Sequence, residues 1–390
     1  DRIIFSSEFR SLQDKTQVVP FSQGDFVHTR LTHSLETSVV GRSLGRKVGV
    51  EILKKYPHLK NKLGYQSNDF GAIVASASLA HDIGNPPFGH SGEKSIGQYF
   101  ISGPGKKFKD ILNEKEFQDL CDFEGNANGF KILTQSRPGR EGGLRLSYAT
   151  LGTFVKYPKE SLPVKPSSNI SDKKYGFFQN EKNTYVDIAN ELGLLKDDGG
   201  YNRHPLTFLV EAADDICYTI IDFEDGINLG LVQEDYALEY LINLVRDSIN
   251  TEKYNTLNNT IDRVSYLRAL SINTLINEAV QIFIENEDDI LSGNFHVSLL
   301  KKSKYKSQIS DIIKISVEKI YESKEVIEKE VAGYNIINKL LDTFISSVNR
   351  YYEGNQTSYD DLILKLLPST TNLNHDNLYS RLLEICHYVA

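Results

Sequence analysis

A histidine and an aspartate that stand side by side, His81 and Asp82, are the residues with the clearest potential for chemistry. An imidazole nitrogen and a carboxylate oxygen together suit a divalent Mn, Fe, Zn or Mg ion. The residues 69–81 form a run of small and apolar side chains that predicts a buried helix. Because Gly84 and the Asn-Pro-Pro sequence after it break that helix at once, we predict that both side chains meet one ion over its end.

The dipeptide is a weak signal when it stands alone. A second pair, His375 and Asp376, occurs in a polar stretch with no buried helix before it, and we interpret it as part of a solvated loop. The first pair could also be a hydrogen-bonded pair that only caps its helix. Further candidate ligands elsewhere in the chain are needed to decide between a metal site and a helix cap.

Two further segments carry such candidates. His33 stands at the beginning of 34–55, where apolar residues recur with the period of a helix. Asp214, Tyr218 and Asp222 follow one another at intervals of four residues in an apolar helical segment, so they share one face. Buried carboxylates need a partner or a cation, which a metal ion and a polar ligand would supply. The alternative is that this face lies in solvent.

The composition is that of a globular protein with 390 residues, of which 25% are charged and 40% hydrophobic. No apolar run approaches the roughly 18 residues that span a bilayer, so we expect no membrane partner. The net charge of -8 argues against a broad nucleic-acid surface but allows a local basic pocket for a small polyanion. Three widely separated cysteines exclude a cysteine-rich zinc site and favour the reducing cytoplasm.

Helices must position these residues, because helical periodicity dominates the chain. It is clearest in the segments 34–55, 69–81, 204–222 and 235–350. Glycine, proline, serine and lysine cluster within 137–185, where we expect loops or short strands. The predicted fold is all-α with few or no short strands. We predict a catalytic core over 1–230 and a helical C-terminal part over 231–390 that packs on this core.

The order of His33, the His81–Asp82 pair and Asp214 resembles the signature of the HD superfamily. Longer strings are similar to the deoxyguanosine triphosphate triphosphohydrolase family: RIIFSSEFRSLQDKTQVVP, TRLTHS, LAHDIGNPPFGHSGE, FEGNANGF, YATLGTFVKYP and EAADDICYTIIDFEDGI. These strings cover most of residues 1–230, whereas the C-terminal half matches less distinctively. The resemblance implies an all-helical HD-domain core. It also implies hydrolysis of a dNTP, with dGTP preferred, to a deoxynucleoside and inorganic triphosphate.

By resemblance and by residue type, His33, His81, Asp82 and Asp214 hold one divalent ion. Mn or Mg is the ion that we expect first, and Fe, Ni, Co or Zn also suits this ligand set. Octahedral coordination would leave two positions, one for a water and one for an oxygen of the α-phosphate. The neighbouring Asp215 points elsewhere on a helix, so only one of the two aspartates should bind the ion.

The resemblance also supplies a catalytic histidine, His90, which follows Asp82 by eight residues. A histidine titrates near neutral pH, and by resemblance this one would protonate the departing 5′ oxygen. Glu93 follows it by three residues and would orient or tune its ring.

Substrate contacts follow from the same family strings. Four residues would meet the triphosphate or reach the site beside it: Arg30, Asn126, Lys156 and Tyr157. Four others would select the sugar: Gln17, Val18, Tyr218 and Asp222. In the second group, Gln17 and Asp222 would bond the 3′ hydroxyl, which a buried polar site can require strongly. Val18 would crowd the 2′ position, and Tyr218 would stack under the deoxyribose.

Two other functions stay open at this point. One is phosphohydrolysis of another nucleotide, such as a nucleoside 5′-monophosphate, with release of orthophosphate. The other is a nucleotide-sensing or single-strand DNA-binding regulatory protein that keeps the metal site without turnover. Members of the family commonly form hexamers, so the resemblance also implies a homo-oligomer, with single-stranded DNA as a candidate effector.

Overall fold

The computed structural model describes residues 1–390 except 19–26, 138 and 374. The described residues form helices and loops, and their only β-type contacts are isolated bridges. The predicted all-α fold is therefore confirmed, and the described part of 137–185 contains short helices and loops but no strand. No helix in the described ranges has the length and apolar character that a membrane span requires.

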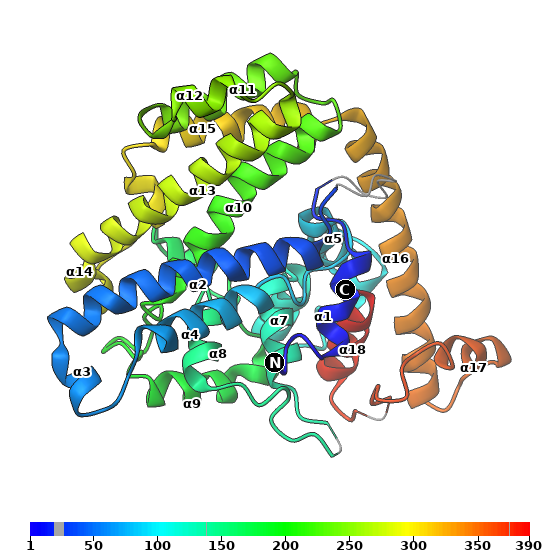
Figure 1. The fold of residues 1–390 in the computed structure, drawn as a ribbon. Helices are drawn as coiled ribbons and strands as arrows, with labels where there is room; N and C mark the ends of the chain where they lie inside the picture. Colours follow the sequence, from blue (N-terminus) through cyan, green and yellow to red (C-terminus); the bar gives the residue numbers. More distant parts are fainter. Residues whose placement is uncertain (19–26, 138, 374) are drawn as a thin grey trace.

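Helices α2 (Arg30–Lys55) and α4 (Ser67–Ala80) lie side by side at the centre of the fold (Figure 1). Their backbones approach closely because glycines of α2 face α4. A Cβ added to Gly45 would lie 2.6 Å from a backbone oxygen of α4. A Cβ added to Gly41 would lie 2.4 Å from the hydroxyl oxygen of Ser78. Both segments were predicted as helices, and the glycines explain why they can pack so tightly.

The ends of the central helices place polar side chains next to one another. The Thr29 hydroxyl accepts a hydrogen bond from the N–H of Thr32, whose hydroxyl in turn accepts one from the N–H of Thr29. This capping box fixes the start of α2. Helix α4 ends at Ala80, so His81 caps it, as the sequence predicted. The long helix α10 (Thr207–Asn228) packs across α2 and α4.

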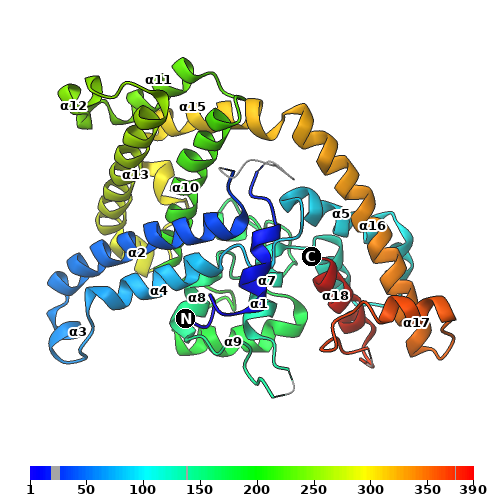
Figure 2. The ribbon, with the colours of Figure 1, turned by 45° about the vertical axis from the view of Figure 1, so that its right-hand side comes forward.

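The remaining helices surround this centre. In the first half of the chain they are α1 (Ser7–Arg10), α3 (Pro57–Asn61), α5 (Gly89–Ile101), α6 (Glu114–Cys121), α7 (Gly125–Thr134), α8 (Tyr148–Phe154) and α9 (Lys182–Glu191). In the second half they are α11 (Glu234–Val245), α12 (Thr251–Asn255), α13 (Thr260–Glu285), α14 (Glu287–Leu291), α15 (Lys306–Ser316), α16 (Lys324–Tyr352), α17 (Ser358–Leu364) and α18 (Leu378–Val389). Figure 2 shows α16 along the outer edge of the molecule, where it packs against α5, α17 and α18.

Buried apolar side chains form two clusters. The larger one reaches from Ile3 to Val326 and includes residues on both sides of residue 230. The smaller one joins α5 to α16 and α18, for example through Phe100, Leu341 and Leu382. The C-terminal helices therefore share apolar interior with the first half of the chain, and the two-part division near residue 230 stays a prediction.

His204 lies just before α10 and is held as a neutral imidazole. Its Nδ1 accepts hydrogen bonds from the Leu206 N–H (3.2 Å) and from the Thr153 hydroxyl (3.0 Å). Burial lowers the pKa of His204 from 6.5 to about 4. Between these two pH values the unfolded chain binds one more proton at this site than the folded chain. Stability is therefore lost as the pH falls through this window.

We expect protonation of His204 in the unfolded chain to lower the free energy of unfolding by about 2 kcal/mol between pH 7 and pH 5. His204→Asn keeps an acceptor for the Leu206 N–H, as in an Asx turn, but has no group that titrates. In urea titrations at the two pH values, this variant should lose correspondingly less stability than the wild type. If the wild type and His204→Asn lost equal free energies of unfolding between pH 7 and pH 5, the folded protein would have to accept a proton on His204.

Candidate active site

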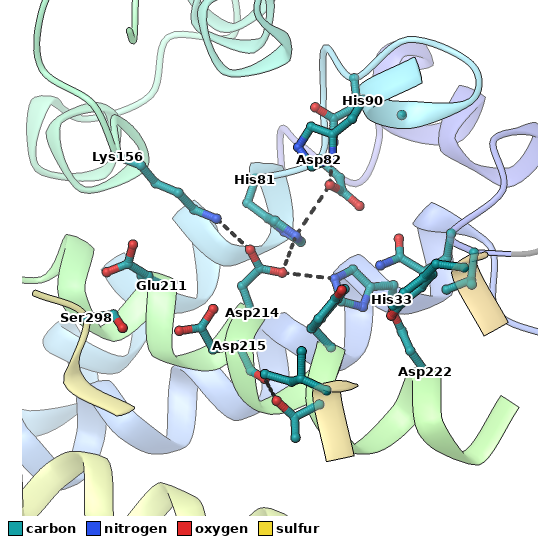
Figure 3. A pocket seen from close by; sticks show the side chains of 18 of the residues that line it. His33, His81, Asp82, His90, Lys156, Glu211, Asp214, Asp215, Asp222 and Ser298 are labelled. Carbon is teal, nitrogen blue, oxygen red and sulfur yellow. Dashed lines mark hydrogen bonds and ion pairs between the residues drawn. The ribbon is translucent and has the colours of Figure 1, made fainter. Parts of the chain in front are cut away.

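Three helices bring the predicted metal ligands together (Figure 3). Ligand atoms of His33, His81 and Asp82 lie within 4.8 Å of one another, and all three side chains are buried. Asp214 of α10 completes the cluster, because its Oδ1 lies 3.2 Å from Nε2 of His33 and 3.3 Å from Nε2 of His81. Residues from three separate sequence segments thus meet at one point.

The hydrogen bonds of this cluster leave ligand atoms available for a cation. Nδ1 of His81 lies 2.6 Å from the carbonyl oxygen of Ser78, and since a carbonyl oxygen only accepts, Nδ1 carries the proton. In the neutral ring, Nε2 of His81 then carries the lone pair, and it lies 3.3 Å from Oδ1 of Asp214. Nε2 of His81 and Oδ2 of Asp82 are buried and have no hydrogen-bond partner among the described residues. A divalent cation fits this set, because it would satisfy atoms whose burial is otherwise costly.

Two basic side chains balance the ligand carboxylates. Nζ of Lys156 lies 2.6 Å from Oδ2 of Asp214, and Nη1 of Arg30 lies 2.9 Å from Oδ1 of Asp82. Burial alone would raise the pKa of both aspartates, but Lys156 and Arg30 outweigh burial and hold these pKa values below the ordinary range. Both carboxylates are therefore ionised at neutral pH. The two basic residues that the sequence assigned to the triphosphate, Lys156 and Arg30, therefore form ion pairs with two of the predicted metal ligands.

His90 lies at the start of α5 and faces the cavity. The residue is exposed to the cavity, but desolvation by nearby protein atoms lowers the pKa of His90 to about 4 and Lys174 adds to this effect, which favours the neutral ring at pH 7. Glu93, one turn later, accepts a hydrogen bond from the N–H of Gly125 at 2.8 Å, and its other oxygen lies 3.3 Å from Nζ of Lys174. No hydrogen bond joins Glu93 to His90 among the described contacts. Glu93 thus pairs with Lys174, the cation whose charge lowers the pKa of His90.

One cavity of about 880 Å³ connects these groups. It is lined by every residue that the sequence assigned to the site: Gln17, Val18, Arg30, His33, His81, Asp82, His90, Glu93, Asn126, Lys156, Tyr157, Asp214, Tyr218 and Asp222. The predicted metal ligands and His90 therefore line the same cavity as the residues that are expected to select a sugar.

Comparison with known proteins is consistent with this arrangement. Residues 30–123, which include His33, His81 and Asp82, match the HD domain. A Synechocystis sp. protein named deoxyguanosinetriphosphate triphosphohydrolase-like protein is 40% identical over 402 aligned residues, which cover 100% of this chain and 89% of the relative. The chain belongs to the deoxyguanosinetriphosphate triphosphohydrolase family.

Other members of this triphosphohydrolase family also align with most of this chain. A Pseudomonas aeruginosa protein of the same name is 38% identical, and the alignment covers 100% of this chain and 88% of the relative. The deoxyguanosinetriphosphate triphosphohydrolase of Yersinia enterocolitica is 33% identical over 88% of this chain and 75% of its own length. The HD-domain match ends before Lys156 and Asp214, whereas the alignment with the Synechocystis sp. relative covers the whole chain and so spans both positions.

This member of the triphosphohydrolase family has a second polar wall in the cavity, at Tyr218 and Asp222 of α10. The ring of Tyr218 stacks on that of Tyr321, with centroids 5.5 Å apart and an interplanar angle of 12°. The Tyr321 hydroxyl donates a hydrogen bond to Oδ2 of Asp222 at 2.8 Å. Oδ1 of Asp222 and Oε1 of Gln17 are buried without a hydrogen-bond partner among the described residues. Such acceptors suit the hydroxyl of a sugar.

Several cavity residues of this triphosphohydrolase-family chain were not predicted from the sequence. They are Lys173, Lys174, Glu211, Asp215, Lys301, Lys306, Tyr321 and Glu330. The adjacent lysines 173 and 174 were a signal that sequence reasoning could have used. Tyr321 ends a π-helix, Val317–Tyr321, whose sequence gives no such signal, although π-turns often mark functional sites.

Asp215 lines the cavity but lies outside the ligand cluster. Burial raises its pKa, and the neighbouring Glu211 adds to the rise. The adjacent Asp214 has the opposite shift because Lys156 outweighs burial there. The surroundings therefore favour the protonated form of Asp215 and the ionised form of Asp214, which agrees with the prediction that only Asp214 binds the ion.

Proposed function

We propose that this protein hydrolyses dGTP or other dNTPs to a deoxynucleoside and inorganic triphosphate. One observation carries the proposal: the His–Asp cluster, the neutral His90 and the wall formed by Tyr218 and Asp222 line the same cavity. A cation site beside a wall of sugar-binding groups suits a nucleotide whose phosphates reach the cluster. Membership of the triphosphohydrolase family favours triphosphate release over other phosphohydrolase reactions.

Four side chains would hold one divalent ion, which we propose to be Mn or Mg: His33, His81, Asp82 and Asp214. Such an ion, when bound, screens phosphate charge and lowers the pKa of water for attack on the α-phosphorus. Lys156 and Arg30 can bind phosphate oxygens once their carboxylate partners are shared with a cation. Fe, Ni, Co and Zn are the other ions to compare in the assay, because the ligand set accepts them too.

His90 supplies the proton for the leaving group in this proposal. The neutral ring is favoured in the free protein, where desolvation and Lys174 lower its pKa to about 4. A bound triphosphate places negative charge beside Lys174 and Arg30, which raises the pKa of His90 and favours its protonation. The ring then donates its proton to the 5′ oxygen of the departing deoxynucleoside.

Product analysis tests the proposed function. The protein is incubated with each dNTP and each rNTP in Mn²⁺ or Mg²⁺, and the products are separated. We expect dGTP to yield deoxyguanosine and inorganic triphosphate. GTP should yield no guanosine and no inorganic triphosphate. Stepwise release of orthophosphate would identify a different phosphohydrolase, and nucleotide binding without turnover would identify a sensing protein.

Asp222→Ala should weaken selection for the 3′ hydroxyl. The side chain presents a buried Oδ1 without a described partner, while the Tyr321 hydroxyl holds Oδ2 in place. We expect kcat/KM for dGTP to fall roughly 100-fold, while the value for 2′,3′-dideoxy-GTP changes little, because that analogue has no hydroxyl to bond. Asp215→Ala removes another cavity carboxylate of α10 and should leave the ratio of the two substrates unchanged. An unchanged ratio in Asp222→Ala would refute the assignment.

The assembly, the location and the effector of the protein are proposals that rest on family resemblance. We expect a homo-oligomer, a hexamer as is common in the family, in the cytoplasm. Light scattering of the purified protein measures its size. Adding single-stranded oligonucleotides to the dGTP assay tests DNA as an effector.

A further inference from the structure

The turn that carries His90 has an unusual backbone conformation. Phe88, two residues before His90 and at the N-cap of α5, has φ 64° and ψ 19°, in the left-handed region. A residue with a Cβ is strained there, so the surrounding structure must hold it in place. The described contacts of Phe88 therefore include structure that helps to fix the position of the histidine.

The ring of Phe88 lies directly against the backbone of α16 at Gly333. A Cβ added to Gly333 would lie 2.4, 2.5 and 2.6 Å from three atoms of this ring. Gly333 is buried in the interior of α16, where glycine is less favourable than alanine. The space that the ring requires explains a glycine at this position, whereas helix propensity opposes it.

Hydrogen bonds beside this contact tie α5 to the same face of α16. The Ser91 hydroxyl donates to Oε2 of Glu330 at 2.8 Å, and the Ser95 hydroxyl donates to the carbonyl oxygen of Tyr334 at 2.9 Å. Glu330, Gly333 and Tyr334 share one face because they are three and four residues apart on the helix. Helix α16 thus holds the start of α5 on both sides of the catalytic histidine (Figure 2).

We propose that Gly333 is a positioning residue for His90. Its bare backbone forms a seat for the Phe88 ring, and this seat fixes the turn that aims His90 into the cavity. The inference rests on the proposed function, in which His90 acts on the substrate. It also gives α16, from the half of the chain that resembles the family less distinctively, a part in setting up the reaction.

Gly333→Ala tests the seat, because the new methyl group must displace the ring. We expect kcat for dGTP to fall roughly 100-fold, since a displacement on the order of 1 Å has an effect of this size. KM for dGTP and the shift in Tm caused by Mn²⁺ should change little, because the metal ligands lie on or next to α2, α4 and α10. A wild-type kcat in this variant would overturn the proposal.

Ala332→Gly is the matched control. This neighbouring residue is exposed, and its change to glycine lowers helix propensity without contact to Phe88. We expect a lower Tm with an unchanged kcat. If Ala332→Gly lowered kcat as much as Gly333→Ala, general weakening of α16 would explain both results and the seat would be refuted.

Phe88→Leu completes a double-mutant cycle. A smaller side chain at position 88 makes room for the methyl group, so adding Phe88→Leu to Gly333→Ala should restore part of the lost kcat, by about tenfold. If the fold-loss in kcat of the double variant equals the product of the losses in the two single variants, the two residues act independently, and this result would contradict the proposal. If Gly333→Ala does not fold, Phe88→Leu alone should lower kcat without changing the Mn²⁺-induced Tm shift, and an unchanged kcat would count against the seat.

A readout without turnover separates this inference from the proposed function. In protein with 13C-labelled histidine, the NMR signal of His90 should move in Gly333→Ala and stay in place in Ala332→Gly. If the wild type hydrolyses no dNTP but the His90 signal moves in Gly333→Ala, the proposed function is wrong while the positioning role of Gly333 is supported. If the signal stays in place in Gly333→Ala, the seat is refuted whatever the activity.

Discussion

His81→Gln is expected to lower kcat for dGTP roughly a thousandfold and to remove most of the stabilisation that Mn²⁺ or Mg²⁺ provides. A glutamine amide can still donate a hydrogen bond to the Ser78 carbonyl, as Nδ1 of His81 does at 2.6 Å. It offers no ring nitrogen to a cation, so Asp82, Asp214 and His33 would have to hold the ion alone. The measurements are initial rates over a range of metal concentrations and the Tm with and without each ion.

The chain contains its own control for this experiment. His375 also precedes an aspartate, but its Nδ1 contacts only the Asn372 amide at 3.4 Å among the hydrogen bonds described, at an exposed site. His375→Gln should therefore leave both kcat and the metal-induced Tm shift unchanged. Full activity in His81→Gln, or an equal loss in His375→Gln, would refute the assignment of the metal site.

The second large effect is expected for His90→Ala, which should lower kcat by roughly 10²- to 10⁴-fold without changing the metal-induced Tm shift. His90 lines the cavity but is not part of the ligand cluster. Removal of this proton donor should therefore slow the chemical step while the cation still binds. This pattern would separate His90→Ala from His81→Gln, which is expected to lose both activity and metal.

A changed leaving group tests the role of His90 more sharply. In a dGTP analogue with sulfur in place of the 5′ bridging oxygen, the departing thiolate needs little protonation. His90→Ala should then slow hydrolysis of the analogue much less than hydrolysis of dGTP. If the two substrates suffer equal losses, His90 does not protonate the leaving atom, although it could still position the substrate.

Much of the fold was predictable because local sequence patterns and tertiary packing agree. The end of α4 at Ala80 follows from the glycine and prolines just beyond it. Helix α2 begins at Arg30, ahead of the apolar period, because the Thr29–Thr32 capping box starts the helix early. The packing of α16 on α5 could not be predicted, since no local pattern specifies which distant helix an apolar face will meet.

The composition of the site was more predictable than its internal contacts. His33, His81, Asp82 and Asp214 were predicted together from the family resemblance and from their residue types, and the structure places their side chains next to one another. The partner of Glu93 could not, because its carboxylate meets Lys174 and a backbone N–H from distant segments. Tyr321 was missed for the same reason: its stacking on α10 depends on how the C-terminal helices fold back over the cavity.

The glycine contacts between α2 and α4 have a consequence for ion selectivity. Gly41 lies against Ser78, the residue whose carbonyl orients His81, while His33 stands on α2 two turns before Gly41. One turn later, at Gly45, backbone atoms of α4 lie directly against α2, so no side chain remains between the two helices there that could adjust by changing its rotamer. We therefore expect the main chain to fix the separation of His33 and His81 in advance. If these residues bind an ion as proposed, the site should favour ions whose bond lengths match this separation.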